Sequence, residues 1–194
     1  MGFAISWLAV SGKAPQQVLQ ELQLHRTGET EEFPESPVSS AQLPTGWFLV
    51  FANRFASPLV ADGSLQQLSS GCTVISCQVE EQMMFSSATC HSNGKNNWHV
   101  AHDAQESIYH LSANGDLPPE FNDIYASLKQ EQEQDDAGGE KSDVDYIHDV
   151  PVSLAKAITS FKHDQDIQGN SPEPFEILAS SSSPASAKPW WKIW

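Results

Sequence analysis

Histidine, cysteine and aspartate residues gather between positions 90 and 110, and these side chains bind metals, transfer protons or act as nucleophiles. Cys90 and His99 would form a thiolate–base pair if two neighbouring strands brought them together, with Asp103 orienting the imidazole ring. A small-molecule-binding or hydrolytic enzyme built on these three residues is therefore one interpretation of the sequence. All three are also ordinary residues of a β-rich segment, so purely structural roles are the alternative.

The same segment lacks the spacing of a metal site. His99 and His102 are three positions apart, which places them on opposite faces of a β-strand. A zinc ion needs three or four nitrogen or sulfur ligands, and Cys90 with His99 supplies only two. The sequence also lacks the Gly-x-Gly-x-x-Gly and Gly-Lys-Ser/Thr patterns that hold nucleotide phosphates. We therefore expect neither a metal nor a cofactor.

Carboxylates crowd around the apolar pair Phe33-Pro34, and we predict that they contact a basic partner. They are Glu29, Glu31, Glu32 and Glu35. The whole chain has 25 acidic and 10 basic residues, giving a formal net charge of −15. Such a balance disfavours nucleic-acid backbones and anionic membrane surfaces, and it favours basic protein partners. A bound cation is a second interpretation. The alternative to both is a solvated loop, which the acidic and then Pro- and Ser-rich composition predicts over residues 29–44.

A second candidate contact segment is Lys188-Pro-Trp-Trp-Lys-Ile-Trp194, which follows a serine-rich stretch. Trp190, Trp191 and Trp194 each bury about 150–250 Å² when they pack, so leaving all of them in water is costly. We predict that the segment docks on another surface. The protein's own surface, a partner groove and a membrane interface stay open as that surface.

The histidines must be positioned by β-structure, because residues 71–111 read as a β-meander. Asn93-Gly94 between two β-like runs is a strong signal for a type I′ hairpin turn. A two-residue loop would pair Thr89 with Trp98 and would place Cys90 and His99 as diagonal neighbours on the opposite face. A shift of one residue in this pairing would invert the two faces.

The remaining patterns predict an α+β fold with an antiparallel or mixed sheet of five to seven strands, covered on one face by three or four helices. Apolar runs at 3–10, 46–52 and 72–79 predict strands, and 144–150 a shorter one. Segments from Pro15, Asp62, Asp116 and Pro151 predict helices, because apolar residues recur there at helical spacing. We expect the helix after Asp116 to end near residue 131, where a charged, Gly-containing linker over 131–140 begins. We expect one globular domain over residues 1–164 and a flexible Ser/Pro-rich tail over 165–194.

These features favour a non-catalytic, intracellular protein-interaction domain, and an inhibitor or immunity-type role against a basic partner would suit it. The three cysteines show no disulfide framework, which favours a reduced, cytoplasmic setting. The apolar run near the start is too short to span a bilayer, so we expect no stable membrane insertion. The enzyme built on Cys90, His99 and Asp103 remains the competing class.

Overall fold

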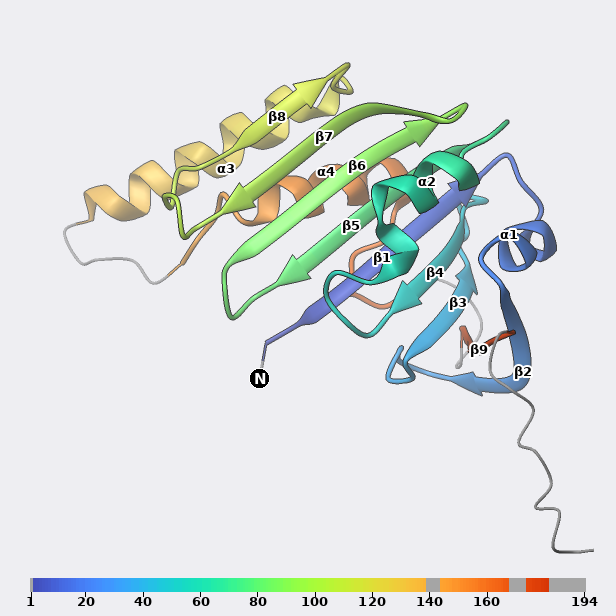
Figure 1. Cartoon of the computed structure of the whole chain (residues 1–194). Helices are drawn as coiled ribbons and strands as arrows, with labels where there is room; N and C mark the ends of the chain where they lie inside the picture. The colour runs from blue at the N-terminus through green and yellow to red at the C-terminus, as the bar shows by residue number, and fades with distance from the viewer. Residues whose placement is uncertain (1, 139–143, 168–173, 182–194) are drawn as a thin grey trace, which may run out of the picture.

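A computed structural model describes residues 2–138, 144–167 and 174–181. Within these ranges, nine strands form an antiparallel sheet, which confirms the predicted α+β class with an antiparallel or mixed sheet. In their order across the sheet (Figure 1), the strands are β2 (Leu24–Glu31), β9 (Phe175–Ser180), β3 (Val38–Gln42), β4 (Phe48–Ala52), β1 (Ala4–Ser11), β5 (Thr73–Glu80), β6 (Phe85–Ser92), β7 (Lys95–Asp103) and β8 (Ser112–Gly115). The predicted number of five to seven strands is too low, because the polar strands β2 and β3 and the late strand β9 also join the sheet.

The helices of the described ranges lie on both sides of this sheet, not on one as the sequence predicted. They are α1 (Pro15–Glu21), the 3-10 helix η1 (Pro58–Val60), α2 (Asp62–Leu68), α3 (Glu120–Ala137) and α4 (Asp149–Thr159). Figure 1 shows α3 and α4 behind the sheet and α2 in front of it. None of the described helices is long and apolar enough to cross a membrane.

The two-sided arrangement follows from β1, which is apolar on both faces and lies between β4 and β5. Side chains alternate along a strand, so Trp7 packs in one core with residues of α4, whereas Leu8 packs in a second core with Val18 of α1 and Leu65 of α2. A strand that is apolar on both faces needs cover on both, and helices on a single face would have left Leu8 in water.

The connection between β6 and β7 consists of Asn93 and Gly94, whose φ angles are 51° and 76°. Ser92 pairs with Lys95, and the pairing then shifts by one residue, because Cys90 pairs with Trp98. The extra residue is Asn97, a β-bulge on β7. The shift inverts the face assignment predicted from the sequence, so the predicted pairing of Thr89 with Trp98 is wrong.

Several predicted boundaries are also wrong. The predicted loop from residue 29 to 44 contains β3 and the end of β2, and the predicted strand at 144–150 is a turn that leads into α4. Helix α3 continues through Ala137, beyond the predicted end near residue 131. Buried Gln132 stabilises the added part, because its amide nitrogen donates to the Val144 carbonyl and its oxygen accepts from the Tyr146 backbone N–H.

Strand β9 lies inside the sheet, hydrogen-bonded to β2 on one side and β3 on the other. Phe175 and Leu178 of this strand are buried. The predicted boundary at residue 164 therefore cuts through the folded part of the chain. Residues 182–194, which include Trp190, Trp191 and Trp194, lie outside the described residues.

Candidate functional site

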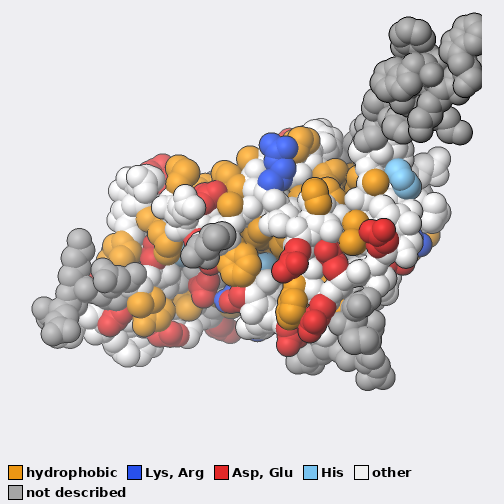
Figure 2. All heavy atoms as spheres, turned by 90° about the horizontal axis from the view of Figure 1, so that it is seen from below, with side chains coloured by type: hydrophobic (Ala, Val, Ile, Leu, Met, Phe, Trp, Pro, Cys, Tyr) orange, Lys and Arg blue, Asp and Glu red, His pale blue; other side chains and the backbone are white. Residues whose placement is uncertain are grey.

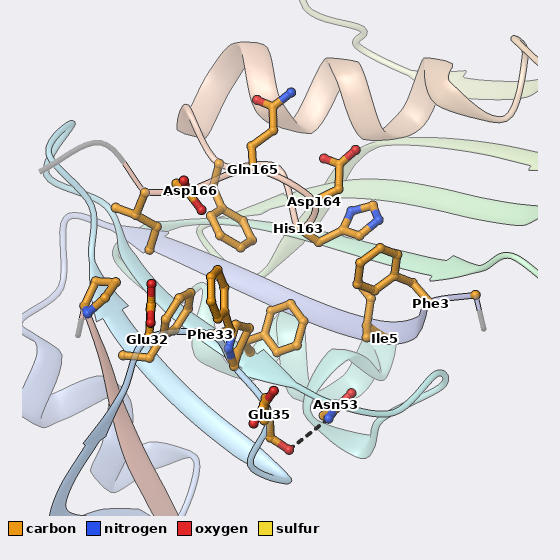
Figure 3. A pocket seen from close by; sticks show the side chains of 17 residues that line it. Phe3, Ile5, Glu32, Phe33, Glu35, Asn53, His163, Asp164, Gln165 and Asp166 are labelled. Carbon is orange, nitrogen blue, oxygen red and sulfur yellow. Dashed lines mark hydrogen bonds between the residues drawn. The ribbon is translucent and has the colours of Figure 1, made fainter. Parts of the chain in front are cut away.

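A pocket of about 850 Å³ opens where the beginning of β1 and the end of β4 meet two loops (Figure 3). One loop joins β2 to β3, and the other follows α4. The pocket is largely apolar, and its lining includes Ile5, Phe51, Phe161 and Phe175. Phe161 meets Trp7 edge to face at 5.2 Å between ring centroids, so the floor belongs to the packed core and is rigid.

The rim of the pocket is acidic. Glu32 and Glu35 come from the β2–β3 loop, and Asp164 and Asp166 from the segment after α4. Asp164 is 3.1 Å from the Lys162 ammonium, whereas the other three carboxylates make no ion pair with any described residue. No lysine or arginine is among the described residues that line the pocket. Among the described residues, the negative charge of the rim is therefore balanced only at Asp164.

Acidic and hydrophobic side chains lie beside one another on the face seen from below, where few basic side chains are visible (Figure 2). Phe33, which is 52% exposed, adds an aromatic ring at the pocket mouth. An exposed aromatic ring next to unpaired carboxylates offers a cation both charge attraction and an apolar surface for its aliphatic stem.

His163 is a half-buried polar residue of the pocket lining. Its ring meets Phe3 edge to face at 4.7 Å, and its Nδ1 is buried without a partner among the described residues. Burial lowers the pKa of His163 below its ordinary value of 6.5, and the neighbouring Asp164 carboxylate opposes this shift only in part. The ring is therefore neutral at pH 7, and it adds a hydrogen-bonding atom without adding positive charge.

Local structure holds both loops in place. Helix α4 ends at Ser160, whose left-handed backbone (φ 66°) turns the chain so that Phe161 enters the core. On the other side, the Asn53 side-chain amide donates to the Glu35 carbonyl at 3.0 Å, the dashed contact in Figure 3. Glu31 closes the β2–β3 loop by accepting hydrogen bonds from the Ser36 backbone N–H and hydroxyl.

The four acidic residues predicted to contact a partner therefore have different surroundings in the structure. Glu32 and Glu35 lie on the pocket rim. The Glu31 carboxylate is hydrogen-bonded to Ser36, and Glu29 is an exposed residue of β2 outside the pocket lining. The predicted contact residues Trp190, Trp191 and Trp194 lie outside the described residues.

The catalytic group proposed from the sequence is not assembled. Cys90 is opposite Trp98 and His99 is opposite Thr89, so Cys90 faces one side of the sheet, and His99 and Asp103 face the other. Burial raises the pKa of the Cys90 thiol to about 11, which keeps it protonated at pH 7. The Asp103 carboxylate accepts a hydrogen bond from the Gln105 backbone N–H instead of orienting the His99 imidazole. The one-residue bulge at Asn97 is the physical reason.

A second polar cluster connects β7 to the segment before α4. His102 is fully buried, its Nδ1 donates to the His110 carbonyl at 2.7 Å, and its Nε2 lies 2.8 Å from Asp145. Asp145 also accepts from the His148 backbone N–H at 3.0 Å. Both ring nitrogens of His102 are used, so this cluster joins elements together and offers no free base to a substrate.

No group of three or more His, Cys, Asp or Glu side chains with the geometry to hold a metal ion occurs in the described part of the chain. Sequence reasoning missed the contributions of His163 and Asp166 to the pocket. The available signal was the polar run from Lys162 to Asp166 directly after a helical pattern, since loops that follow rigid elements often carry function.

The arrangement can bind a cationic group on its rim and an apolar group on its floor, and it contains no activated nucleophile among the described residues. No protein-family model, curated protein or solved structure matches the chain.

Proposed function

We propose that this protein is a non-catalytic interaction domain whose pocket binds a basic, apolar-rich segment of another protein. The observation that carries the proposal is an aromatic floor beside the carboxylates of Glu32, Glu35 and Asp166. These carboxylates make no ion pair with a described residue, and the described lining contains no lysine or arginine. Apolar burial would supply most of the affinity, and the carboxylates would supply selectivity and a faster association rate.

A protein segment suits this site better than a nucleic acid or a small anion. Phosphates would meet uncompensated carboxylates, and the formal net charge of −15 adds long-range repulsion. An inhibitor or immunity-type role against a basic partner is one form that this function would take. A cytoplasmic setting is part of the proposal, and the three buried, unpaired cysteines support it.

The test uses the 194-residue chain in which Trp190, Trp191 and Trp194 are replaced by alanine, so that these side chains cannot compete for the pocket. The probe is a fluorescein-labelled seven-residue peptide of alternating lysine and phenylalanine, and fluorescence anisotropy gives its Kd. Two comparison peptides carry glutamate in place of lysine, or glycine in place of phenylalanine. We expect the first peptide to bind most tightly and its Kd to rise with salt, because exposed charges are screened within about 10 Å at 0.1 M salt.

Glu32→Gln, Glu35→Gln and Asp166→Asn combined should weaken this peptide about ten-fold, since each exposed ion pair contributes up to about 1 kcal/mol. The control removes the same number and type of charges elsewhere, by Glu120→Gln, Glu133→Gln and Asp116→Asn. Equal losses in the two variants would show that only net charge matters. In that case the pocket would not be the binding site.

A further inference from the structure

We propose that residues 188–194 of this chain, Lys-Pro-Trp-Trp-Lys-Ile-Trp, are the resident occupant of the acidic pocket in the same molecule. The inference rests on the proposed function in one respect, because both require the pocket to accept a basic, apolar peptide. It adds the identity of one such peptide and the consequence that a partner must displace it.

The chemistry of the two surfaces is complementary. The segment combines three tryptophans and an isoleucine with two lysines, in a chain that has only 10 basic residues against 25 acidic ones. The pocket combines an aromatic floor with three carboxylates that make no ion pair among the described residues. Lysine ammonium groups at both sides of the tryptophan pair can meet rim carboxylates while the indoles enter the apolar part.

The pocket also has room for such an occupant. Its volume of about 850 Å³ lies in the upper part of the range of roughly 300–1,000 Å³ that is usual for small-molecule sites. That space exceeds what one lysine side chain needs, and it suits bulky aromatic side chains. Phe33 and Phe3 at the mouth and the buried Phe161 and Phe175 provide ring edges and faces for them.

The length of chain after the sheet allows the contact within one molecule. Phe175 lines the pocket, and β9 runs from there to Ser180, a distance of about 17 Å at the usual rise per strand residue. The backbone N–H of Ser181 donates to the Gln23 carbonyl at 2.8 Å, which fixes where the chain leaves the sheet. The ten residues from Ser181 to Trp190 span at most about 33–36 Å, roughly twice the distance needed.

The composition of residues 181–187 also allows the chain to lead from the end of β9 back to the pocket. Residues 181–187 are serine, proline and alanine. A flexible ten-residue chain has an r.m.s. end-to-end distance of about 17 Å, and Pro184 and Pro189 lengthen it, so the connection covers the required distance. Effective concentration is highest when these two lengths match, and it reaches the millimolar range for short linkers. A free partner therefore competes with a tethered segment at high local concentration.

Zero-length carbodiimide crosslinking of the 194-residue chain tests the proposal, because it joins a lysine amine to a carboxylate only where the two are in contact. Equal amounts of ¹⁴N- and ¹⁵N-labelled protein are mixed, crosslinked at low micromolar concentration, and digested for mass spectrometry. We expect Lys188 or Lys192 to be linked to Glu32, Glu35 or Asp166, with both linked peptides carrying the same label.

A matched variant separates docking from chance encounters. Trp190→Ala, Trp191→Ala and Trp194→Ala together keep both lysines and the linker but remove the apolar side chains. These links should then fall at least five-fold. Links with mixed labels would show docking in a second copy and would overturn the proposal, as would links spread equally to remote carboxylates such as Glu120 and unchanged in the variant.

The two proposals fail in different ways. If the lysine–phenylalanine peptide binds at the rim but residues 188–194 form no rim crosslinks, this inference is wrong and the proposed function stands. If rim substitutions leave the peptide's affinity unchanged, and residues 188–194 of the parent chain form no rim crosslinks, the pocket is not a site for basic peptides and both are wrong.

Discussion

His163 shows how one half-buried side chain, with its Nδ1 atom buried, affects the chemistry of the pocket. Its position beside Phe3 withdraws the imidazole from water, and burial outweighs the nearby carboxylates that would favour its charged form. A protonated ring at this place would compete with a basic ligand for the rim carboxylates. The neutral ring leaves the acidic rim available at pH 7.

The lowered pKa of His163 makes the fold sensitive to acid. Above pH 6.5 the ring is neutral in both states, whereas below pH 6.5 the unfolded chain takes up the proton first, so stability is lost as pH falls towards the lowered pKa. His163→Phe keeps an aromatic ring against Phe3 and removes this titration. Urea unfolding of this variant should therefore show a smaller loss of stability between about pH 7 and pH 5. A pH dependence equal to that of the parent protein would contradict the burial assigned to His163.

The buried pair of His102 and Asp145 should be a major contributor to stability. Asp145→Ala leaves the His102 Nε2 and the His148 backbone N–H without their acceptor in a buried region. We expect a loss of about 3 kcal/mol in the free energy of unfolding, measured in urea, because an unpaired buried polar group is costly.

The control is Glu133→Ala, which removes an exposed partner of Lys129 at 3.8 Å on α3. This change should cost less than about 0.5 kcal/mol. Similar losses in the two variants would mean that the His102–Asp145 contact is solvated, contrary to the structure.

At the scale of elements, the sequence predicted the two residues of the β6–β7 turn, but it did not predict the pairing register of the two strands. Asn93 and Gly94 adopt the positive φ angles that their residue types favour. The bulge at Asn97 is stabilised from a distance, because its carbonyl accepts from the Asp116 backbone N–H at 2.8 Å. The sequence of the β6–β7 hairpin alone cannot predict this hydrogen bond, because Asp116 lies outside the hairpin. Cys90 and His99 were therefore assigned to the same face incorrectly.

Gly115 tests whether the bulge and β8 depend on each other. A Cβ at Gly115 would collide with the Asn97 carbonyl oxygen and lie 2.8 Å from the Trp98 Cα, and φ is +88°. Gly115→Ala should therefore lower the free energy of unfolding by about 3 kcal/mol. Gly46→Ala is the control, since φ is also +88° but no atom lies within 4 Å, and it should cost only about 1 kcal/mol. Equal costs would indicate that β8 does not pack closely against β7.

Helices and strands whose apolar residues recur at regular spacing could be predicted from the sequence. Elements that depend on contacts with residues far away in the sequence could not. The beginnings of α1, α2 and α4 agree with the residue patterns near Pro15, Asp62 and Pro151. Strand β2 was missed because most of its residues are exposed at the edge of the sheet, so its sequence is polar. Helix α3 was predicted too short because Gln132, a polar residue, is buried by contacts to residues 144–146.

At the scale of the whole molecule, the described lining of the pocket comes from five separate segments of the sequence. They are the start of β1, the β2–β3 loop, the end of β4, the loop after α4 and the start of β9. The sequence could indicate that Glu32 and Glu35 were exposed acidic residues. It could not indicate that they face Asp166 across an aromatic floor, since that depends on β9 inserting between β2 and β3.

Truncation tests this long-range insertion. A chain that stops at Asp164 lacks β9, and β2 then loses its only partner strand among the described elements. Its thermal midpoint should fall by on the order of 10 °C, because burial of Phe175 and Leu178 is lost as well. A chain that stops at Ser181 keeps all the described strands and loses only the docked segment, so its midpoint should fall by no more than about 5 °C. Equal midpoints for the two truncated chains would contradict the place of β9 in the sheet.

The most direct test of the binding proposal is a nuclear magnetic resonance titration of the ¹⁵N-labelled Trp190→Ala, Trp191→Ala, Trp194→Ala chain with the lysine–phenylalanine peptide. If the pocket is the site, the backbone amide shifts that change most will belong to residues 2–5, 32–35, 53 and 161–167, which line or flank the pocket. The same peptide with glutamate in place of lysine should leave them nearly unchanged. Changes centred on residues 90–103, or spread evenly over α3, would contradict the claim that the acidic pocket binds basic, apolar segments.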